Sequence, residues 1–447
     1  MLNCVKKAIL LSVFIFIGCL NVDAQVQNPA HRWFEDARFG LFVHFGPYSV
    51  LCDGEWVLNQ RSLKIDDYKK LQHIFDPRFF DAAQWVRIAK SAGMKYITFT
   101  SRHHDGFSNW DTKQSEWNIM NTPYGKDLVR QLADECHKEG IKLVIYYSLL
   151  DWSRDDYSFT TGRTGQKTGR TEQKNWMSYI GFMKAQLTEL LTNYGEIAGI
   201  WFDGEWDQLP EEKSERFSHD QSKVNWHFDE IYDLIHRLQP DCMIANNHHL
   251  PALPGEDYQA FEKDLPGETT GAGFGVHQTV SDKLPLETCE TMNGSWGYRL
   301  SDNRFKSIKE LIHLLVRSAG YGANLLLNVG PKPTGEIEES CMELLQVMGE
   351  WTNDYGKTIY GTRGGYIKPQ PWGAVTQQGN KLYIHVFSAE NNRLTLPCPY
   401  KIKSAEWLNI KTEKPLVWIQ DKKSGDVTFT LADNLDEIDS IIEVTVK

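Results

Sequence analysis

The segment IAGIWFDGEW, residues 197–206, carries the pattern on which the fold of this chain depends. An uninterrupted apolar run, Ile197 to Phe202, is followed at once by Asp203 and Glu205. Short runs that are apolar at every position are typical of strands buried on both faces, as in a parallel sheet. The two carboxylates would then lie at the carboxyl end of a buried strand.

Further runs of this kind recur along the chain, at residues 39–45, 96–100, 142–148, 243–245 and 323–329. Between them, Arg78 to Ala92 and Lys126 to Glu139 place apolar residues three and four apart, and a glycine follows each stretch. This spacing predicts helices, and strands that alternate with helices predict parallel β/α units. With two weaker strands near Tyr258 and Leu286, we expect an α/β fold with a (β/α)8-type barrel, complete or distorted.

The pattern changes after about Gly361. Strand-like runs separated by turn residues follow, without a helical pattern, at residues 381–387, 393–396, 405–408, 416–419, 427–431 and 441–446. Such a series predicts an antiparallel β-sandwich. The 447 residues suit a barrel plus a smaller domain, so we predict a catalytic barrel over residues 25–360 and a C-terminal β-sandwich domain over residues 361–447.

The first 24 residues have the pattern of a signal peptide. Lys6 and Lys7 precede an apolar stretch, Ala8 to Leu20, that is too short to span a membrane, and Val22-Asp23-Ala24 resembles a cleavage site. We therefore expect no transmembrane segment and a mature chain that is periplasmic or extracellular. Cleavage before Cys19, which would anchor a lipoprotein, is the second choice, because Phe16 fits poorly three residues before that cysteine.

Composition narrows the class of partner. The formal net charge is −11 and no run of Lys or Arg occurs, whereas nucleic-acid binding requires a concentrated basic face. We expect no nucleic-acid partner and a neutral polar substrate. No cysteine pair has zinc-like spacing and no glycine-rich phosphate loop is present, so we expect no metal and no cofactor. The sequence does not decide the oligomeric state.

Polar residues gather where the predicted strands end. His44, His103 with His104, Asp151, Asp203 and the Asn246-Asn247 pair each follow an apolar run. In a β/α barrel these positions meet at the carboxyl-end mouth, the face on which catalysis occurs. A metal site at His103 and His104 is disfavoured, because adjacent residues point in opposite directions if the strand continues through them.

Asp203 is the strongest candidate for chemistry. Glycoside cleavage uses one carboxylate as nucleophile and one carboxylic acid as proton donor. Asp203 follows a strand, with Trp201 two residues earlier on the same face. The alternative is that Asp203 caps the next helix, a common use of aspartate.

At this point the chain resembles glycoside hydrolase family 29, the α-L-fucosidases. The resemblance covers nearly all of the mature chain and rests on an ordered set of segments: RFGLFVHFGPYSV (38–50), GEWV (54–57), SRHHDGF (101–107), YYSLLDW (146–152), WFDGEW (201–206), ETCETMNGSWGY (287–298), NLLLNVGPKPTGEI (324–337) and YGTRGG (360–365). It implies a retaining exo-α-L-fucosidase that hydrolyses terminal α-L-fucosyl groups of oligosaccharides or glycoconjugates through a covalent fucosyl-enzyme.

The resemblance also implies roles for individual residues. Asp203 matches the family's nucleophile. The residues that match its fucose pocket are His44, Glu55, Trp56, His103, His104, Tyr146 or Tyr147, and Trp201.

The acid/base is harder to place. Glu262, in a predicted loop within GEDYQAFEKDLPG, is preferred. Glu287 is the rival, but it lies in a strand-like segment and could instead fix the geometry of the pocket. Glu205 and Asp257 are weaker candidates.

One departure from the family pattern concerns the substrate contacts. Many relatives carry an arginine after the asparagine pair, whereas this chain has His248 and His249 there. Arg299 could supply a replacement. Two alternative functions remain at this point: another exo-glycosidase, and a fucose-binding barrel protein without catalysis.

Overall fold

The computed structural model describes residues 29–210, 218–268, 278–412 and 415–447. The predicted signal peptide, residues 1–24, and Cys19 therefore lie outside the described residues. Among the helices that are described, none combines the length and apolar character needed to cross a membrane.

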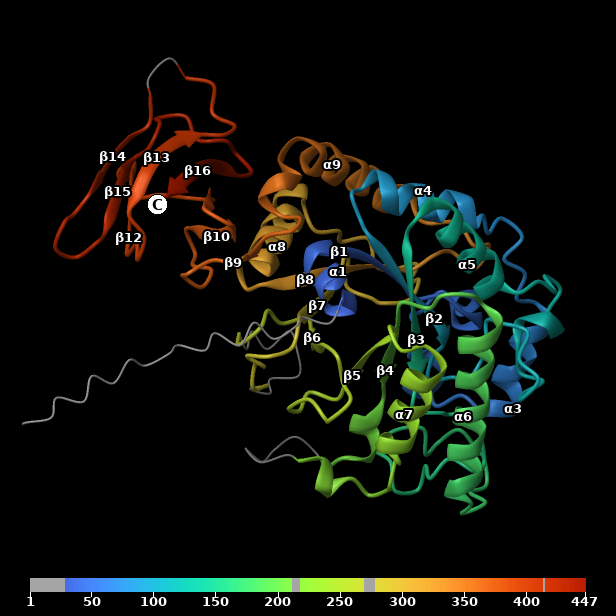
Figure 1. Cartoon of the computed structure of the whole chain (residues 1–447). Helices are drawn as coiled ribbons and strands as arrows, with labels where there is room; N and C mark the ends of the chain where they lie inside the picture. The colour runs from blue at the N-terminus through green and yellow to red at the C-terminus, as the bar shows by residue number, and fades with distance from the viewer. Residues whose placement is uncertain (1–28, 211–217, 269–277, 413–414) are drawn as a thin grey trace, which may run out of the picture.

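A parallel sheet of eight strands forms the centre of the larger part of the molecule (Figure 1). Its strands are β1 (Phe39–Val43), β2 (Tyr96–Arg102), β3 (Lys142–Ser148), β4 (Gly199–Asp203), β5 (Met243–Asn247), β6 (Gln259–Glu262), β7 (Leu286–Thr291) and β8 (Ala323–Val329). Their order is β5-β4-β3-β2-β1-β8-β7-β6, so the first and last strands along the chain are neighbours. That order is the one expected of a β/α barrel.

The barrel closes between β5 and β6. Within the described residues these two strands share no hydrogen-bonded ladder. The backbone amides of Asp257 and Tyr258, just before β6, donate instead to the carbonyl oxygen of Ile244 in β5, at 2.8 and 3.3 Å. The prediction of a (β/α)8-type barrel, complete or distorted, is confirmed, and this irregular junction is its distortion.

Helices surround the barrel and bury their apolar faces against it (Figure 1). They are α1 (Pro29–Ala37), α2 (Val57–Gln60), α3 (Ile65–Tyr68), α4 (Ala82–Ser91), α5 (Leu128–Glu139), α6 (Trp176–Asn193), α7 (Phe228–Leu238), α8 (Ile308–Gly320) and α9 (Glu339–Tyr355). Short 3-10 helices are η1 (Pro47–Leu51), η2 (Lys69–His73), η3 (Ile119–Asn121), η4 (Glu205–Gln208), η5 (His219–Gln221) and η6 (Gly356–Thr358).

Capping side chains set where the predicted helices begin. The side chain of Asp81 accepts from the amide of Gln84 at 3.0 Å, and that of Asp127 accepts from the amide of Arg130 at 2.7 Å. Each aspartate satisfies an amide that the first turn leaves without a partner, so α4 and α5 begin directly after them. Gly140 ends α5 at φ 70°, as predicted for a glycine stop.

The predicted strands at 142–148 and 323–329 are confirmed residue for residue, and the two weaker strands exist as β6 and β7. The prediction that Glu262 lies in a loop is wrong, because Glu262 is the last residue of β6. It pairs with Cys289 in β7, and the amide of Lys263 donates to the carbonyl of Cys289 at 2.9 Å. Glu262 is therefore held by the sheet.

Two antiparallel sheets follow the barrel (Figure 1). One has the order β13-β16-β11-β10-β9 and the other the order β12-β15-β14. The strands are β9 (Arg363–Gly364), β10 (Gly373–Gln378), β11 (Lys381–Val386), β12 (Arg393–Leu396), β13 (Ile402–Trp407), β14 (Val417–Gln420), β15 (Val427–Thr430) and β16 (Ser440–Val446). Side chains of both sheets, among them Ile384, Val444, Leu394 and Phe429, share one buried cluster, which confirms the sandwich.

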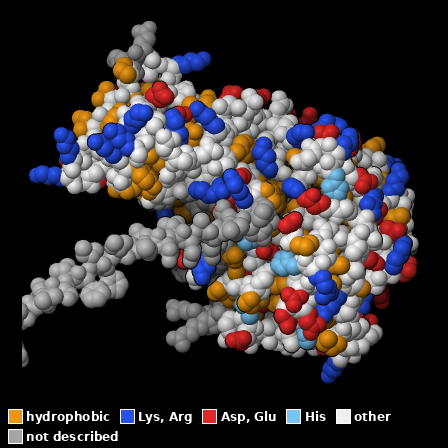
Figure 2. Space-filling model, in the orientation of Figure 1, with side chains coloured by type: hydrophobic (Ala, Val, Ile, Leu, Met, Phe, Trp, Pro, Cys, Tyr) orange, Lys and Arg blue, Asp and Glu red, His pale blue; other side chains and the backbone are white. Residues whose placement is uncertain are grey.

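The sandwich packs on α8. The ring of His313 stacks on Phe387 at a centroid distance of 3.6 Å, and its Nε2 donates to the carbonyl of Ile438 at 2.6 Å. Over the face seen in Figure 2, acidic and basic side chains are interspersed on the barrel, whereas the charged side chains on the sandwich are mainly Lys and Arg. The division into a barrel domain ending at residue 360 and a sandwich domain beginning at residue 361 stays a prediction.

Candidate active site

A pocket of about 340 Å³ opens at the carboxyl ends of the barrel strands. It combines carboxylates, imidazoles and aromatic rings, a lining suited to a polar ring that also has an apolar face. The lining residues are Phe42, His44, Trp56, Gln60, His103, His104, Tyr146, Trp201, Asp203, Trp206, Asn247, Glu262, Lys263, Cys289 and Trp296.

Asp203 ends β4 inside this pocket, held by hydrogen bonds to both carboxylate oxygens. The hydroxyl of Tyr146 donates to Oδ2 at 2.8 Å, and Nε1 of Trp206 donates to Oδ1 at 2.9 Å. The next residue is Gly204 at φ 100°, where a Cβ atom would lie only 2.7 Å from the Cβ of Leu150. Only glycine fits there, and the sharp turn leads into η4 rather than into a long helix that Asp203 would cap.

Glu262 faces Asp203 from the end of β6. Nδ2 of Asn247 donates to Oε2 of Glu262 at 2.8 Å and lies 3.4 Å from Oδ1 of Asp203. These two oxygens therefore cannot be more than about 6 Å apart, which is below the separation of roughly 6.5 to 9.5 Å in inverting glycosidases. The geometry fits the shorter spacing of retaining enzymes.

The two carboxyl groups titrate as a pair. Burial, together with the nearby charge of Glu262, raises the pKa of Asp203 to about 6. Burial also acts to raise the pKa of Glu262, but the hydrogen bond and charge of His249 and the amide of Asn247 outweigh it, and that pKa is lowered. Two buried carboxyls this close do not both ionise readily, so the pair shares one proton over part of the pH range.

Three histidines form one wall of the pocket: His44, His103 and His104. Strand β2 ends at Arg102, so the alternation that would turn one of the adjacent pair away does not apply. The ring centroids of His103 and His104 lie 4.1 Å apart, and both line the pocket. Burial lowers the pKa of each of the three histidines, so the wall is uncharged near neutral pH.

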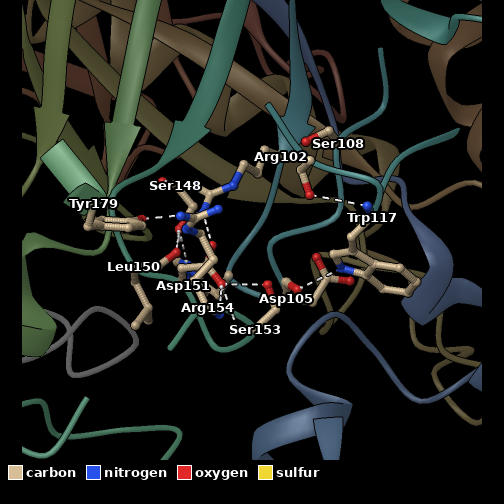
Figure 3. A network of polar contacts seen from close by, with 12 residues as sticks. Arg102, Asp105, Ser108, Trp117, Ser148, Leu150, Asp151, Ser153, Arg154 and Tyr179 are labelled. Atoms are coloured by element: carbon tan, nitrogen blue, oxygen red, sulfur yellow. Dashed lines mark hydrogen bonds and ion pairs between the residues drawn. The ribbon is translucent and has the colours of Figure 1, made fainter. Parts of the chain in front are cut away.

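Behind this wall lies a buried ion pair between Arg102 and Asp151 (Figure 3). Arg102 also donates to the carbonyl oxygen of Ser148 at 2.6 Å, and Asp151 accepts from the amide and the hydroxyl of Ser153 at 2.6 and 2.7 Å. The amide of Trp152 donates to the carbonyl of His104 at 2.7 Å. These contacts fix the loops that follow β2 and β3, and with them the rings that reach the pocket.

Aromatic side chains continue this wall beside His104, whose ring centroid lies 5.7 Å from that of Trp56 and 5.6 Å from that of Trp206. Trp56 stacks on Trp206 at a centroid distance of 5.6 Å, and both line the pocket. Glu55 is not among the lining residues. Its buried carboxylate accepts from the amide of Gly297 at 2.7 Å and so fastens the segment that carries Trp296.

Glu287 and Tyr147 lie outside the pocket lining. Glu287 is buried below it and accepts from the hydroxyl of Tyr96 at 2.5 Å and from Nε1 of Trp201 at 2.9 Å. Burial raises its pKa to about 7. Tyr147 follows Tyr146 on β3, so its ring points to the other face, where its hydroxyl donates to Gln186 of α6 at 2.8 Å. Of the two tyrosines, the structure brings only Tyr146 to Asp203.

Asn247, expected at the mouth of the barrel, does line the pocket, but sequence reasoning did not single out several other lining residues: Phe42, Gln60, Trp206, Lys263, Cys289 and Trp296. Trp206 and Trp296 stand inside quoted family segments, so a signal for them was present in WFDGEW and GSWGY. Lys263 is the cation that lines the pocket, whereas Arg299 pairs with Asp53 at 3.3 Å outside it.

One cluster of the described residues has the composition of a metal site. Glu205, His219 and His248 offer ligand atoms within 4.8 Å of one another. Each is already engaged: Nδ1 of His219 contacts Glu205 at 2.8 Å, and Nδ1 of His248 accepts from the amide of Leu250 at 2.9 Å. Since that amide occupies the Nδ1 lone pair of His248, its Nε2 carries the hydrogen and donates to Glu256 at 3.0 Å. The donor set fits a hydrogen-bond network better than a metal ion.

Comparison with known proteins gives a consistent result. The sequence profile described as Alpha-L-fucosidase matches residues 20–357. The chain is 28% identical over 436 residues to an alpha-L-fucosidase of Dictyostelium discoideum, covering 91% of this chain and 87% of that protein. It is 28% identical to the human tissue alpha-L-fucosidase, covering 89% and 84%.

Among solved structures, the chain is similar to alpha-L-fucosidase isoenzyme 1 from Paenibacillus thiaminolyticus. The TM-score is 0.78 at 31% sequence identity, and the match covers 94% of this chain and 99% of that one. The similarity therefore extends over barrel and sandwich together.

We expect Asp203→Asn to stabilise the folded protein at pH 7.5 by about 1–2 kcal/mol, because it removes a carboxylate whose charged form is disfavoured by burial. The pKa of Asp203 is about 6 when folded, against an ordinary value of 3.8. As the pH rises from 3.8 to about 6, the unfolded state ionises before the folded state, and the free energy of unfolding falls. At a pH below both values the side chain is protonated in the folded and the unfolded state, and the free energy of unfolding is unaffected. Urea unfolding at pH 7.5 and pH 4.5 measures the gain, which should shrink at the lower pH.

The exposed Asp111→Asn variant is the control and should change stability by no more than about 0.5 kcal/mol at either pH. If Asp203→Asn is no more stable than the wild type at pH 7.5, burial does not disfavour the ionised form of Asp203.

Proposed function

The chain belongs to the α-L-fucosidase family, and from this premise we propose that Asp203 is its nucleophile and Glu262 its acid/base. The activity is the retaining hydrolysis of terminal α-L-fucosyl groups of oligosaccharides or glycoconjugates. The observation that carries the assignment is the single amide of Asn247, which contacts both carboxylates and limits their separation to about 6 Å.

In the first step, an oxygen of Asp203 attacks the anomeric carbon of the fucosyl group. The bond from that carbon to the glycosidic oxygen breaks, and Glu262, which must hold the proton that the pair shares when the substrate is bound, gives it to the departing oxygen. A covalent fucosyl-enzyme forms. In the second step, Glu262 takes a proton from a water molecule, the water oxygen attacks the same carbon, and the bond to Asp203 breaks. Two inversions return the original configuration.

The surroundings of Asp203 suit a nucleophile. Tyr146 and Trp206 donate to its two oxygens and favour the ionised form that must attack, against burial and the charge of Glu262, which hold the pKa of Asp203 at about 6. Oε2 of Glu262 has Nδ2 of Asn247 at 2.8 Å and Nε2 of His249 at 3.7 Å, and Glu262 lines the pocket at the end of a strand, where a leaving group can reach it.

Glu287 supports the pocket from below in this proposal. Its bond to Nε1 of Trp201 fixes the ring that lines the floor, and its burial leaves it no path to a leaving group. Family membership and two facing carboxyls also favour catalysis over the sugar-binding alternative.

Asp203→Ala should reduce the hydrolysis of an aryl α-L-fucoside by about 10³-fold or more, because the covalent step is lost. Release of fucose is followed by chromatography, and the configuration of the first product by proton NMR of the wild type. Activity within about tenfold of wild type would rule out Asp203 as nucleophile, and a product of inverted configuration would rule out the two-step mechanism.

Glu262→Ala should lose activity on natural glycosides but regain turnover of a substrate with a good leaving group when azide is added. Azide needs no general base and attacks the fucosyl-enzyme from the side opposite Asp203, so it should yield the α-fucosyl azide, detected by mass spectrometry and assigned as the α anomer by proton NMR. Glu287→Ala is the matched control, since it removes a buried carboxylate that only holds Tyr96 and Trp201. Azide rescue in Glu287→Ala and not in Glu262→Ala would exchange the two assignments.

We also propose that the chain is exported. The basic start, the short apolar stretch and the Val22-Asp23-Ala24 site support cleavage before Gln25 and a periplasmic or extracellular enzyme. Amino-terminal sequencing of the mature protein should read from Gln25; a mature chain that begins with an acylated Cys19 would contradict this and establish the lipoprotein alternative.

A further inference from the structure

His44 makes its side-chain contact through Nδ1, which lies 2.7 Å from Oδ1 of Asn328. The other end of the Asn328 amide is committed, because its Nδ2 donates to the carbonyl oxygen of Trp296 at 2.8 Å. Asn328 therefore presents an oxygen to the histidine, and an amide oxygen can only accept. Nδ1 of His44 must carry the hydrogen.

His104 is in the same position, with a serine as partner. Its Nδ1 lies 2.7 Å from Oγ of Ser148. The serine hydroxyl has one hydrogen, and it donates this to the carbonyl oxygen of Leu150 at 2.5 Å. Ser148 is left with lone pairs toward the histidine, so Nδ1 of His104 is the donor.

The opposite tautomer of His104 would place a hydrogen on Nε2, directed at Asp203. The distance from Nε2 to Oδ2 of Asp203 is 3.5 Å, long for an N–H···O hydrogen bond. It would also require Ser148 to turn its hydrogen to the histidine and leave the buried carbonyl of Leu150 without that donor. One short bond would be exchanged for a long one, so the geometry selects the Nδ1–H form.

Neither ring carries a second hydrogen near neutral pH. His44 and His104 are 5% and 1% exposed, and burial lowers the pKa of His44 to about 4 and that of His104 well below its usual value. A neutral imidazole with hydrogen on Nδ1 has a lone pair on Nε2. Both rings line the pocket, so the pocket wall is made of acceptors at these two positions.

Building on the proposed function, we propose that Ser148 and Asn328 are positioning residues that hold His104 and His44 in the Nδ1–H tautomer, so that their Nε2 atoms accept hydrogen bonds from sugar hydroxyls. His104 accepts from the 2-hydroxyl. Asp203 attacks C1, and C2 is the neighbouring ring carbon that bears a hydroxyl, so the hydroxyl beside the nucleophile is that one. A hydroxyl that donates there also strengthens its contact as positive charge develops on the sugar.

The Nδ1–H tautomer of His104 also affects the nucleophile. An Nε2–H group would point at Asp203 and would leave His104 without the lone pair that accepts from the sugar. With the lone pair in that place, Oδ2 of Asp203 keeps Tyr146 as its donor, and the 2-hydroxyl is drawn to the histidine. Ser148 thus acts on substrate recognition through a ring that it touches from behind.

The tautomer is measured directly by two-bond ¹H–¹⁵N correlation spectra of the full chain labelled with ¹⁵N-histidine at pH 7.5. The signal of His104 is assigned by its loss in His104→Gln. We expect a protonated Nδ1 and an unprotonated Nε2 in the wild type. An Nε2–H signal for His104 would overturn the proposal without any further variant.

Variants then test the role of Ser148. Ser148→Ala should give a mixture of both tautomers, and Ser148→Thr, which keeps the hydroxyl, should restore the wild-type spectrum. Ser101→Ala is the matched control, since Ser101 is an equally buried serine whose hydroxyl donates to a carbonyl, that of Tyr146, without touching a histidine ring. It should leave the His104 signal unchanged. A single Nδ1–H tautomer in Ser148→Ala would show that Ser148 does not set it.

Binding gives the functional readout, as inhibition constants of L-fucose and its 2-deoxy and 4-deoxy analogues. Loss of the 2-hydroxyl should weaken binding by about five- to tenfold in the wild type and in Ser148→Thr, but by about twofold or less in Ser148→Ala. Loss of the 4-hydroxyl should weaken binding by the same factor in the wild type, in Ser148→Thr and in Ser148→Ala. An undiminished 2-hydroxyl effect in Ser148→Ala would contradict the proposal, whereas failure of the proposed function would appear as absent hydrolysis in the wild type.

Discussion

The pocket depends on the ion pair between Arg102 and Asp151, which is excluded from water on both sides. Charges this deeply buried are tolerated only when each has its partner, and removal of one leaves the other uncompensated. Arg102 ends β2 and Asp151 follows β3, so the requirement that they meet fixes the ends of two strands relative to each other. His103 and His104 follow directly from one of them and Trp152 from the other. The guanidinium also reaches Tyr179 of α6 at 3.3 Å, which ties the outer helix into the same arrangement.

Much of the fold could be predicted because buried parallel strands are apolar without interruption. The runs at 142–148 and 323–329 show this, and so does Asp203, which follows the run that ends at Phe202. β6 and β7 were harder, because β6 is short and β7 carries Glu287 and Glu290 in place of apolar residues. Glu287 supports Trp201 from below the pocket and Glu290 pairs with Lys306 at 3.4 Å, and both interrupt the apolar pattern of the strand.

The less predictable parts of the site depend on local geometry. Strand alternation separates Tyr146 from Tyr147, but the register that brings Tyr146 inward is set by pairing with β2 and β4. Lys263 lies beside Glu262 in the pocket because its backbone has φ 57°, outside the strand region, so alternation stops there. No pattern in the sequence predicts this positive φ angle at Lys263. Asn247 could be placed at a strand end, but its contact with two carboxylates requires the barrel to close.

The junction between β5 and β6 separates the two reacting carboxyls. Asp203 stands on β4 on one side of it and Glu262 on β6 on the other, and within the described residues the strands that flank it share no ladder. The distance between the two carboxyl groups therefore depends on the side-chain amide of Asn247 and on the carbonyl oxygen of Ile244, which accepts hydrogen bonds from two backbone amides. Asp257 and Tyr258 take part in this closure, but Pro254 and Gly255 just before them are exposed, so the connection can change in length there without shifting any strand register. This junction is thus where the scaffold can accept insertions, while the seven hydrogen-bonded strand pairs of the barrel stay fixed.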